Sequence, residues 1–277
     1  MASQRQKKFP LWAGYAEHAP TLSMWRMIVM RRILALALAP IVLLAGCGNG
    51  GDANAAAPSA EGGDAAVTAP APGRDWTTVV RRTEAGGYMV GNPNAAVKLV
   101  EYGSRTCPAC AAFDMTGKPA LLNTYVRTGR VSYEFRDFLI HPMDLGVALL
   151  GRCVSADRFF PMLDQMFVNQ RTLLSGASSI PQATIARIQA MPPQQAAAAW
   201  AEMLGYLDFV KQRGVSETRA RQCLANANET EVLVQILRTA VNEGVSGTPT
   251  FFINGRKVEN VSGWAQLEPA LRAAGAR

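Results

Sequence analysis

The sequence predicts an α/β protein whose mixed central sheet is interrupted by an inserted all-helical subdomain. Strand-forming runs stand at both ends of the folded part, and a long block between them has the period of amphipathic helices. A Cys-x-x-C sequence, Cys107-Pro108-Ala109-Cys110, follows an apolar strand and precedes a helix. This order of elements places the cysteine pair where a strand gives way to a helix.

The folded part divides into three segments by the elements that its patterns predict. Residues 76–141 are expected to hold strands and a helix, residues 142–243 to be helical, and residues 244–277 to hold strands and a last helix. The expected strands lie at 77–81, 97–102, 131–135, 250–253 and 257–261. The expected helices lie at 111–126, 143–154, 158–169, 179–191, 193–210, 216–226, 229–243 and 264–274.

The first 46 residues have the organisation of a bacterial secretion signal. Two arginines precede an apolar stretch at 33–44, which is shorter than the roughly 20 residues that cross a membrane. Leu44-Ala45-Gly46-Cys47 resembles a bacterial lipobox, which implies cleavage before Cys47 and lipidation of this residue. An ordinary secretory signal that is cut elsewhere is the alternative. Residues 1–29 add nothing to the signal, which indicates a mis-assigned start, with Met24, Met27 and Met30 as candidates.

Residues 47–75 are expected to be the lipidated cysteine and a disordered tether. The tether is rich in Gly, Ala, Pro, Ser and Asp and has no apolar periodicity. It would anchor the folded part to a membrane of the bacterial cell envelope, facing the periplasm. Removal of residues 1–46 leaves 22 basic and 20 acidic residues, so the net charge falls from +7 to +2. The charge therefore gives no support for a nucleic-acid partner.

The surroundings of the Cys-x-x-C sequence predict a reactive thiol pair. Pro108 suits the first position of a helix, and the unpaired N–H groups there stabilise a thiolate on Cys107. Cys107 is therefore the predicted nucleophile, exposed at the helix start, and Cys110 the shielded resolving thiol. Half of a zinc site and two inert thiols are the alternatives. A zinc site needs about four ligands, usually Cys and His, whereas the chain has His18 and His141 only.

Export to an oxidising compartment explains the three other cysteines. Five cysteines are an odd number for an exported protein, which usually indicates a free or intermolecular thiol. Lipidation of Cys47 removes one of them. Cys153 and Cys223 then remain beside the reactive pair and are expected to form a structural disulfide in the helical subdomain. Two separate buried thiols are the alternative.

Three separated segments resemble the DsbA-type oxidoreductases of the thioredoxin fold. The first is Glu101-Tyr102-Gly103-Ser104-Arg105-Thr106 with the following Cys-x-x-C, which has the acid six residues before the nucleophile. The second is the helical insertion after Phe135-Arg136-Asp137-Phe138. The third, Gly244-Val245-Ser246-Gly247-Thr248-Pro249 with the apolar strand after it, resembles the cis-proline loop of that fold. The resemblance covers most of residues 76–277 and implies a thioredoxin fold.

The resemblance also implies roles for individual residues. Pro249 would follow a cis peptide bond, with an ordinary trans turn as the alternative. Thr248 would pair its backbone with an extended client peptide beside Cys107, and Pro108 and Ala109 would belong to the same substrate-binding surface. Glu101 would be a buried acid with a raised pKa that moves protons for Cys110. A solvent-facing glutamate on an edge strand is the alternative for Glu101.

Ala109 departs from the family pattern, because the best-known oxidases of this type carry a histidine there that stabilises the thiolate. The departure predicts a weaker oxidant, in which the helix start and Arg105 supply the remaining stabilisation. Arg105 as a solubilising surface residue is an equal alternative. Lys98 is expected either to pair with Glu101 or to face solvent, and His141 to bound a helix.

The sequence thus predicts an exported, lipid-anchored thiol:disulfide oxidoreductase that donates the Cys107–Cys110 disulfide to folding envelope proteins. A membrane redox partner would reoxidise it, and neither a cofactor nor a metal site is expected. A reductase or isomerase with the same site is the first alternative, which reduction potential would separate from an oxidase. A non-enzymatic binding or metal-handling module is the second, and stoichiometric metal binding would indicate it.

Overall fold

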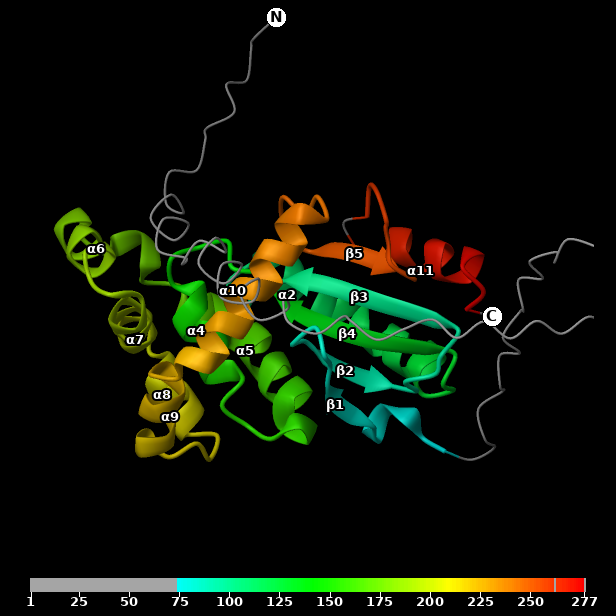
Figure 1. Ribbon diagram of the computed structural model, residues 1–277, viewed down its shortest axis with the longest axis horizontal. Coiled ribbons are helices and arrows are strands. Elements are labelled where there is room, and N and C mark those ends of the chain that lie inside the picture. Colours follow the sequence, from blue (N-terminus) through cyan, green and yellow to red (C-terminus); the bar gives the residue numbers. More distant parts are fainter. Residues whose placement is uncertain (1–73, 262, 277) are drawn as a thin grey trace, which may run out of the picture. The chain divides into compact units, whose positions relative to one another are not determined.

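The computed structural model describes residues 74–261 and 263–276 of the 277-residue chain (Figure 1). The secretion signal at 1–46, the candidate start methionines, Cys47 and nearly all of the tether lie outside the described residues. Within the described part, no helix is long and apolar enough to cross a membrane.

Six strands of the described part form one mixed sheet in the order β1-β2-β4-β3-β5-β6. They are β1 (Val80–Arg82), β2 (Tyr88–Gly91), β3 (Val97–Gly103), β4 (Val131–Asp137), β5 (Thr250–Ile253) and β6 (Arg256–Lys257). β3 and β4 are parallel, and the other neighbouring pairs are antiparallel. The mixed sheet built from both ends of the folded part is confirmed.

The first part of the sheet differs from the prediction. The strand expected at 77–81 starts only at Val80, because Asp75 accepts a hydrogen bond from the N–H of Thr77 and caps a short 3-10 helix, η2 (Trp76–Thr78). β2 is absent from the prediction. Its four residues are surrounded by glycines, which are typical of a loop, and only pairing with β1 and β4 makes this segment a strand.

Left-handed backbone shortens two other predicted elements. Asn260 has a φ of 59°, which ends the extended backbone expected at 257–261, so that β6 has two residues. Gly205 has a φ of 76°, which breaks the helix expected at 193–210. The two resulting helices are α7 (Pro193–Met203) and α8 (Tyr206–Lys211).

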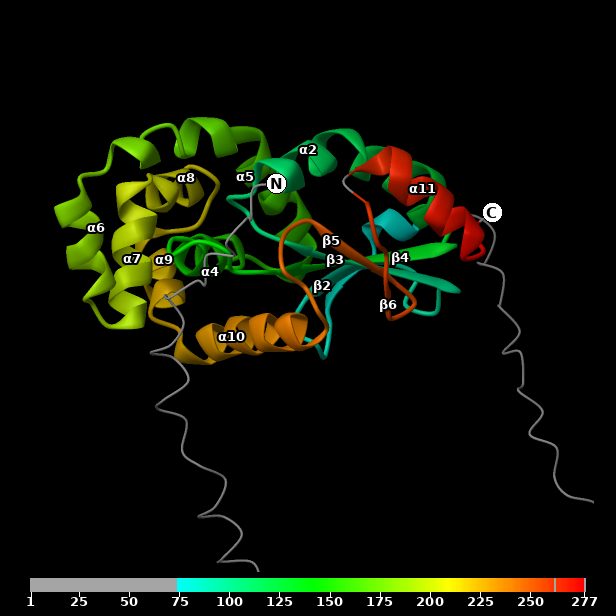
Figure 2. The ribbon, with the colours of Figure 1, turned by 90° about the horizontal axis from the view of Figure 1, so that it is seen from above.

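Helices cover both faces of the sheet. Figure 2 shows α2 (Pro108–Thr116) and α11 (Trp264–Ala273) on one face and α10 (Ala227–Asn242) on the other. α5 (Phe159–Leu173) packs with α2 on the first face, where Phe113, Phe135 and Phe251 belong to one apolar core. On the second face, Tyr102 and Phe252 pack with residues of α10. Because successive side chains of a strand point to opposite faces, Glu101 is directed toward α2 and Tyr102 toward α10.

The helix expected at 111–126 consists of three shorter pieces. They are α2, α3 (Lys118–Ala120) and a π-helical turn, η3 (Leu121–Val126). Gly117 joins the first two. A Cβ atom at this position would lie 2.7 Å from the ring of Phe113 and 3.0 Å from Trp264, so a glycine is what allows α11 to approach α2.

Between β4 and β5, the regular elements of the described chain are all helical. In addition to those already given, they include α4 (Asp144–Gly151), α6 (Gln182–Gln189) and α9 (Glu217–Leu224). A second apolar core holds these helices together and contains Leu149, Trp200 and Tyr206. The expected pair Cys153 and Cys223 is a disulfide in the structure, with 5.8 Å between the Cα atoms. It joins the chain after α4 to the end of α9.

Candidate active site

The cysteine pair lies where β3 leads into α2. Cys107 immediately precedes the helix, and Pro108 occupies its first turn, as the sequence predicts. Both cysteines are reduced thiols. The side chain of Cys107 is 5% exposed and that of Cys110 is fully buried.

The prediction that Cys107 is exposed is therefore wrong. The loop before β5 lies against this thiol, since the Sγ atom of Cys107 donates to the carbonyl oxygen of Thr248 at 3.3 Å. The sequence contains no indication of how closely the two segments approach, because they are 141 residues apart. Cys110 is the more deeply buried of the two, in the expected order.

The two thiols have very different acidities. The pKa of Cys107 is lowered to about 5, mainly because the Cys110 thiol donates a hydrogen bond to it. The Thr248 side chain and the backbone N–H groups of Cys110 and Ala109 contribute in the same direction, against the effect of burial. Burial raises the pKa of Cys110 well above its ordinary value, and its bond to Cys107 and the nearby Glu101 add to this. At neutral pH the pair thus holds a Cys107 thiolate and a Cys110 thiol.

The loop that faces Cys107 contains the features that the resemblance implies. The peptide bond between Thr248 and Pro249 is cis. The hydroxyl of Thr248 is buried and, apart from its effect on the pKa of Cys107, has no hydrogen-bond partner among the described residues. It is therefore free to donate to a thiolate on Cys107.

Arg105 has neither of the roles expected for it. Its side chain is buried, and its Nε donates to Asp137 at 2.7 Å. The guanidinium also lies over the ring of Phe159, 5.1 Å from the centroid. Arg105 is thus not a surface residue, and its guanidinium is paired with Asp137 and not with the Cys107 sulfur. A buried carboxylate, which no local pattern reveals, decides where this arginine points.

Glu101 is a buried acid beneath the cysteine pair. Its side chain is 1% exposed, and the hydroxyl of Tyr133 donates to it at 2.7 Å. Burial raises its pKa to about 8, an effect that the Tyr133 hydrogen bond opposes. The alternative of a solvent-facing glutamate on an edge strand is excluded, because β3 is paired on both sides.

A buried lysine lies near Glu101, and it is not Lys98. Lys118 of α3 forms ion pairs with Asp114 of α2 and Asp164 of α5. Asp164 is the partially exposed member, with 43% of its side chain accessible. Lys118 lowers the pKa of Glu101 and Asp114 raises it. This cluster is absent from the prediction, although an Asp and a Lys four residues apart in a helical pattern are a signal for such a pair.

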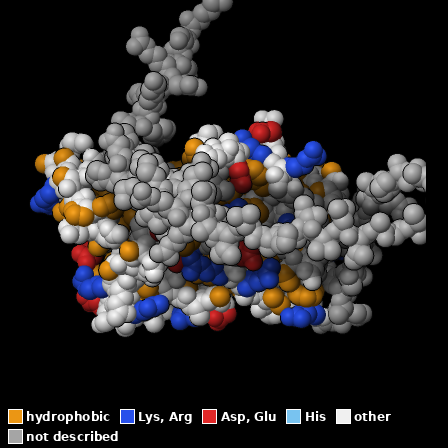
Figure 3. Space-filling view, in the orientation of Figure 1, with side chains coloured by type: hydrophobic (Ala, Val, Ile, Leu, Met, Phe, Trp, Pro, Cys, Tyr) orange, Lys and Arg blue, Asp and Glu red, His pale blue; other side chains and the backbone are white. Residues whose placement is uncertain are grey.

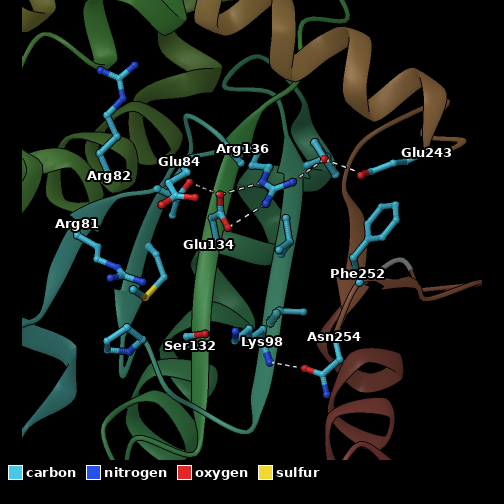
Figure 4. Close-up of a pocket in the computed structure, with 18 residues that line it drawn as sticks. Arg81, Arg82, Glu84, Lys98, Ser132, Glu134, Arg136, Glu243, Phe252 and Asn254 are labelled. Atoms are coloured by element: carbon cyan, nitrogen blue, oxygen red, sulfur yellow. Dashed lines mark hydrogen bonds and ion pairs between the residues drawn. The ribbon is translucent and has the colours of Figure 1, made fainter. Parts of the chain in front are cut away.

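Lys98 lies on the opposite face of the sheet, where it lines a groove of about 750 Å³ (Figure 4). Its backbone N–H donates to the side chain of Asn254. Arg136 pairs with Glu134 in the same groove. Lys and Arg side chains alternate with acidic and uncharged ones over the described part of the face in Figure 3. Of the two positions expected for Lys98, the solvent-facing one is found, since the residue is exposed.

The loop before Cys107 is held by α4. Asp144 accepts hydrogen bonds from the hydroxyls of Ser104 at 3.1 Å and Thr106 at 2.5 Å. It also accepts from the backbone N–H of His141, which bounds this helix as expected. The ring of His141 lies 2.8 Å from the Thr106 hydroxyl through Nδ1. The helical insertion therefore contacts the segment that carries Cys107.

This arrangement of a Cys-x-x-C pair, a buried acid and a cis-proline loop occurs on a fold with known relatives. The family model described as Thioredoxin matches residues 83–273. The chain belongs to the thioredoxin family. A crystal structure of a protein-disulfide isomerase from Novosphingobium aromaticivorans is 31% identical, with a TM-score of 0.64, over 67% of this chain and 95% of that one.

More distant members of the family are also similar. A Rickettsia typhi protein, provisionally named a protein-disulfide oxidoreductase, is 28% identical over 187 residues, which are 67% of this chain and 61% of that protein. The chain therefore spans about three fifths of this relative. The α-DsbA1 of Wolbachia pipientis is 19% identical, with a TM-score of 0.51 over 68% of this chain and 90% of that one, and shares the DsbA-type fold.

Proposed function

We propose that this chain is an exported protein thiol:disulfide oxidoreductase that donates the disulfide of Cys107 and Cys110 to folding envelope proteins. The observation that carries the proposal is the lowered pKa of Cys107, about 5, beside a Cys110 whose pKa is raised. A stabilised thiolate favours the reduced form of the pair, so the disulfide form is a good oxidant. A membrane redox partner then returns the pair to the disulfide.

The residues divide the transfer into two steps. A client thiolate attacks the Cys107 sulfur, the bond to Cys110 breaks, and the electron pair leaves on Cys110. Glu101 is protonated at neutral pH because its pKa is about 8, and it supplies the proton that Cys110 takes up. A second client thiolate then attacks the client sulfur of the mixed disulfide. The client leaves with a disulfide and Cys107 leaves as a thiolate.

The client peptide lies between the helix start and the cis-proline loop. Pro108 and Ala109 are exposed at the start of α2, and Thr248 and Pro249 form the opposite side. An extended peptide would pair its backbone with that of Thr248. Its entry has to displace the contact between Cys107 and the Thr248 carbonyl, which covers the thiol in the free protein.

A reductase or isomerase is the second candidate. The observation that favours it is the similarity to a protein whose crystal structure is titled a protein-disulfide isomerase. The equilibrium with glutathione decides between the two. An oxidant would have a potential well above that of thioredoxin, about −270 mV, and a value near that of thioredoxin would support the reductase.

Substitution of one cysteine at a time tests the assigned roles in the full chain. In Cys110→Ser, client proteins should remain joined to Cys107, because the resolving thiol is absent, whereas Cys107→Ser should trap almost none. Trapping by Cys107→Ser alone would reverse the roles. Trapping by neither variant, together with stoichiometric metal binding, would support a non-enzymatic binding or metal-handling module.

The location of the protein is part of the proposal. Lipidation of Cys47 would anchor the chain in the cell envelope, with the folded part facing the periplasm. Intact mass of the protein extracted from membranes tests this, since the mature chain should begin at an acylated Cys47. A different N-terminus would contradict the lipid anchor and leave the chemistry of the thiol pair unaffected.

A further inference from the structure

Gln170 is a buried polar residue on the inner face of α5. The neighbouring buried positions of this helix, Leu163, Met166 and Phe167, are apolar, whereas Gln170 is 5% exposed. Its side-chain amide donates two hydrogen bonds. One goes to the backbone carbonyl of Arg105 at 2.9 Å and the other to that of Cys107 at 3.0 Å.

These two carbonyls belong to the segment that leads into α2. The Cys107 carbonyl also accepts from the N–H of Ala111 at 3.1 Å, which is the first hydrogen bond of the helix. A carbonyl oxygen can accept two hydrogen bonds, and Gln170 supplies the second. The amide thus holds the Arg105–Thr106 and Cys107–Pro108 peptide units in one orientation.

The orientation of the helix start matters because its N–H groups act on the nucleophile. The N–H groups of Ala109 and Cys110 donate to Cys107 and help to lower its pKa. An N–H group is an effective donor only when the N–H···acceptor angle is near linear, and the hydrogen bond weakens steeply as this angle decreases. A few degrees of rotation of the first turn would therefore weaken the stabilisation of a Cys107 thiolate.

We infer that Gln170 is a positioning residue of the nucleophile, through which the helical insertion controls the thiolate of Cys107. The inference rests on the proposed function only in taking Cys107 as the nucleophile. It does not depend on whether the pair acts as an oxidant or a reductant. Gln170 does this through backbone carbonyls alone, so it needs no contact with the sulfur atom.

The test compares thiolate formation in wild type and Gln170→Met, which keeps the length of the side chain and removes both donors. Thiolate is followed by absorbance at 240 nm in a pH titration, with Cys107→Ser as the blank. Loss of the two hydrogen bonds that orient the helix start should make thiolate formation roughly tenfold less favourable, which is a rise of about one unit in the pKa of Cys107. The equilibrium constant with glutathione should move toward the disulfide form by a similar factor.

A matched control separates positioning from general stability. Gln165→Met lies on the same helix, where its exposed side chain contacts Arg213, and should leave the titration of Cys107 unchanged. A Gln170→Met protein that melts at a lower temperature but titrates like wild type would overturn the inference. So would an equal effect of the two substitutions.

A second variant covers the case in which Gln170→Met does not fold. Gln170→Ser leaves space for water, which can bond to the two carbonyls, and should titrate between wild type and Gln170→Met. An unchanged titration in a folded Gln170→Ser would also overturn the inference. If wild type exchanged no disulfide with a client while the titrations differed as expected, the proposed function would fail and the positioning role would stand.

Discussion

At the scale of single residues, the acidity of Cys107 comes from groups that differ from the expected ones. Ala109 has no charged group, and the guanidinium of Arg105 forms an ion pair with Asp137. The Cys110 thiol, the Thr248 side chain and two backbone N–H groups act in their place. All of these are neutral donors, so the low pKa depends on geometry more than on charge.

The Thr248 hydroxyl should contribute measurably to this acidity. Thr248→Val keeps the shape of the side chain and removes the donor, so the pKa of Cys107 should rise from about 5 by an amount that corresponds to roughly one hydrogen bond. A pH titration at 240 nm measures this. Thr250→Val is the control, because that hydroxyl bonds to the Gly247 carbonyl. An identical titration of wild type and Thr248→Val would contradict the assignment.

Glu101 should lower stability at alkaline pH. Its pKa is about 8 in the folded reduced protein and 4.5 in the ordinary case, so between these values the folded state binds a proton that the unfolded state has lost. The contribution of Glu101 to the free energy of unfolding is therefore fully present below about pH 4.5 and is lost as the pH rises through 8. Relative to Glu101→Gln, wild type should therefore lose a few kcal/mol of unfolding free energy between pH 5 and pH 8.

Urea unfolding of both proteins at the two pH values measures this difference, and other carboxyl groups cancel in the comparison. Glu101→Gln should also slow release of Cys110, because the proton donor is gone. A pH dependence of stability that is the same in both proteins would show that Glu101 ionises normally.

At the scale of elements, the interruption of the helix after the cysteine pair brings three helices together around one cation. Gly117 ends α2, and Lys118 then reaches Asp114 and Asp164 on two different helices. Helix α5 therefore packs against α2 through an apolar core and is joined to α3 by the ion pair of Lys118 with the partially exposed Asp164.

Lys118→Met should destabilise the protein by about 3–5 kcal/mol, because it leaves the buried Asp114 without a partner. It should also raise the pKa of Glu101 further above 8, since the lysine lowers it. Asp114→Asn/Lys118→Met should recover much of the loss, because no buried charge is left. Urea unfolding measures the stability. Lys211→Met, whose ion pairs are exposed, should leave it nearly unchanged, because solvent screens such pairs.

At the scale of the whole molecule, the helical insertion is a unit with its own core and its own covalent link. Cys153 and Cys223 are 70 residues apart in sequence and close a loop over most of the insertion. The insertion also supplies Asp144 and Gln170, which hold the nucleophile segment. Its stability is therefore expected to affect the site.

Removal of this disulfide in Cys153→Ala/Cys223→Ala should lower the unfolding free energy by about 2–4 kcal/mol, because the unfolded chain gains freedom. Exchange at Cys107 should continue in the folded fraction, since the two sites are chemically separate. Equilibrium unfolding and disulfide exchange with a small thiol measure the two effects. Loss of exchange in fully folded protein would show that the link itself shapes the site.

The features that depend on neighbouring residues could be predicted from the sequence alone. A proline after Cys107 and an apolar run before it predict the helix start and the central strand, because capping and periodicity act over a few residues. The number of cysteines likewise predicts a disulfide between Cys153 and Cys223. The family resemblance implied the cis bond before Pro249, which is present.

The features that depend on distant segments follow from how the folded chain packs. Three contacts near the site are of this kind: Cys107 with Thr248, Arg105 with Asp137, and Glu101 with Lys118. In each of them the two residues are at least 17 positions apart in the sequence. A pKa depends on burial and on charges a few ångströms away, and neither is encoded in local pattern. The elements could thus be predicted from the order of residues, whereas the chemistry of the thiol pair arises from their packing.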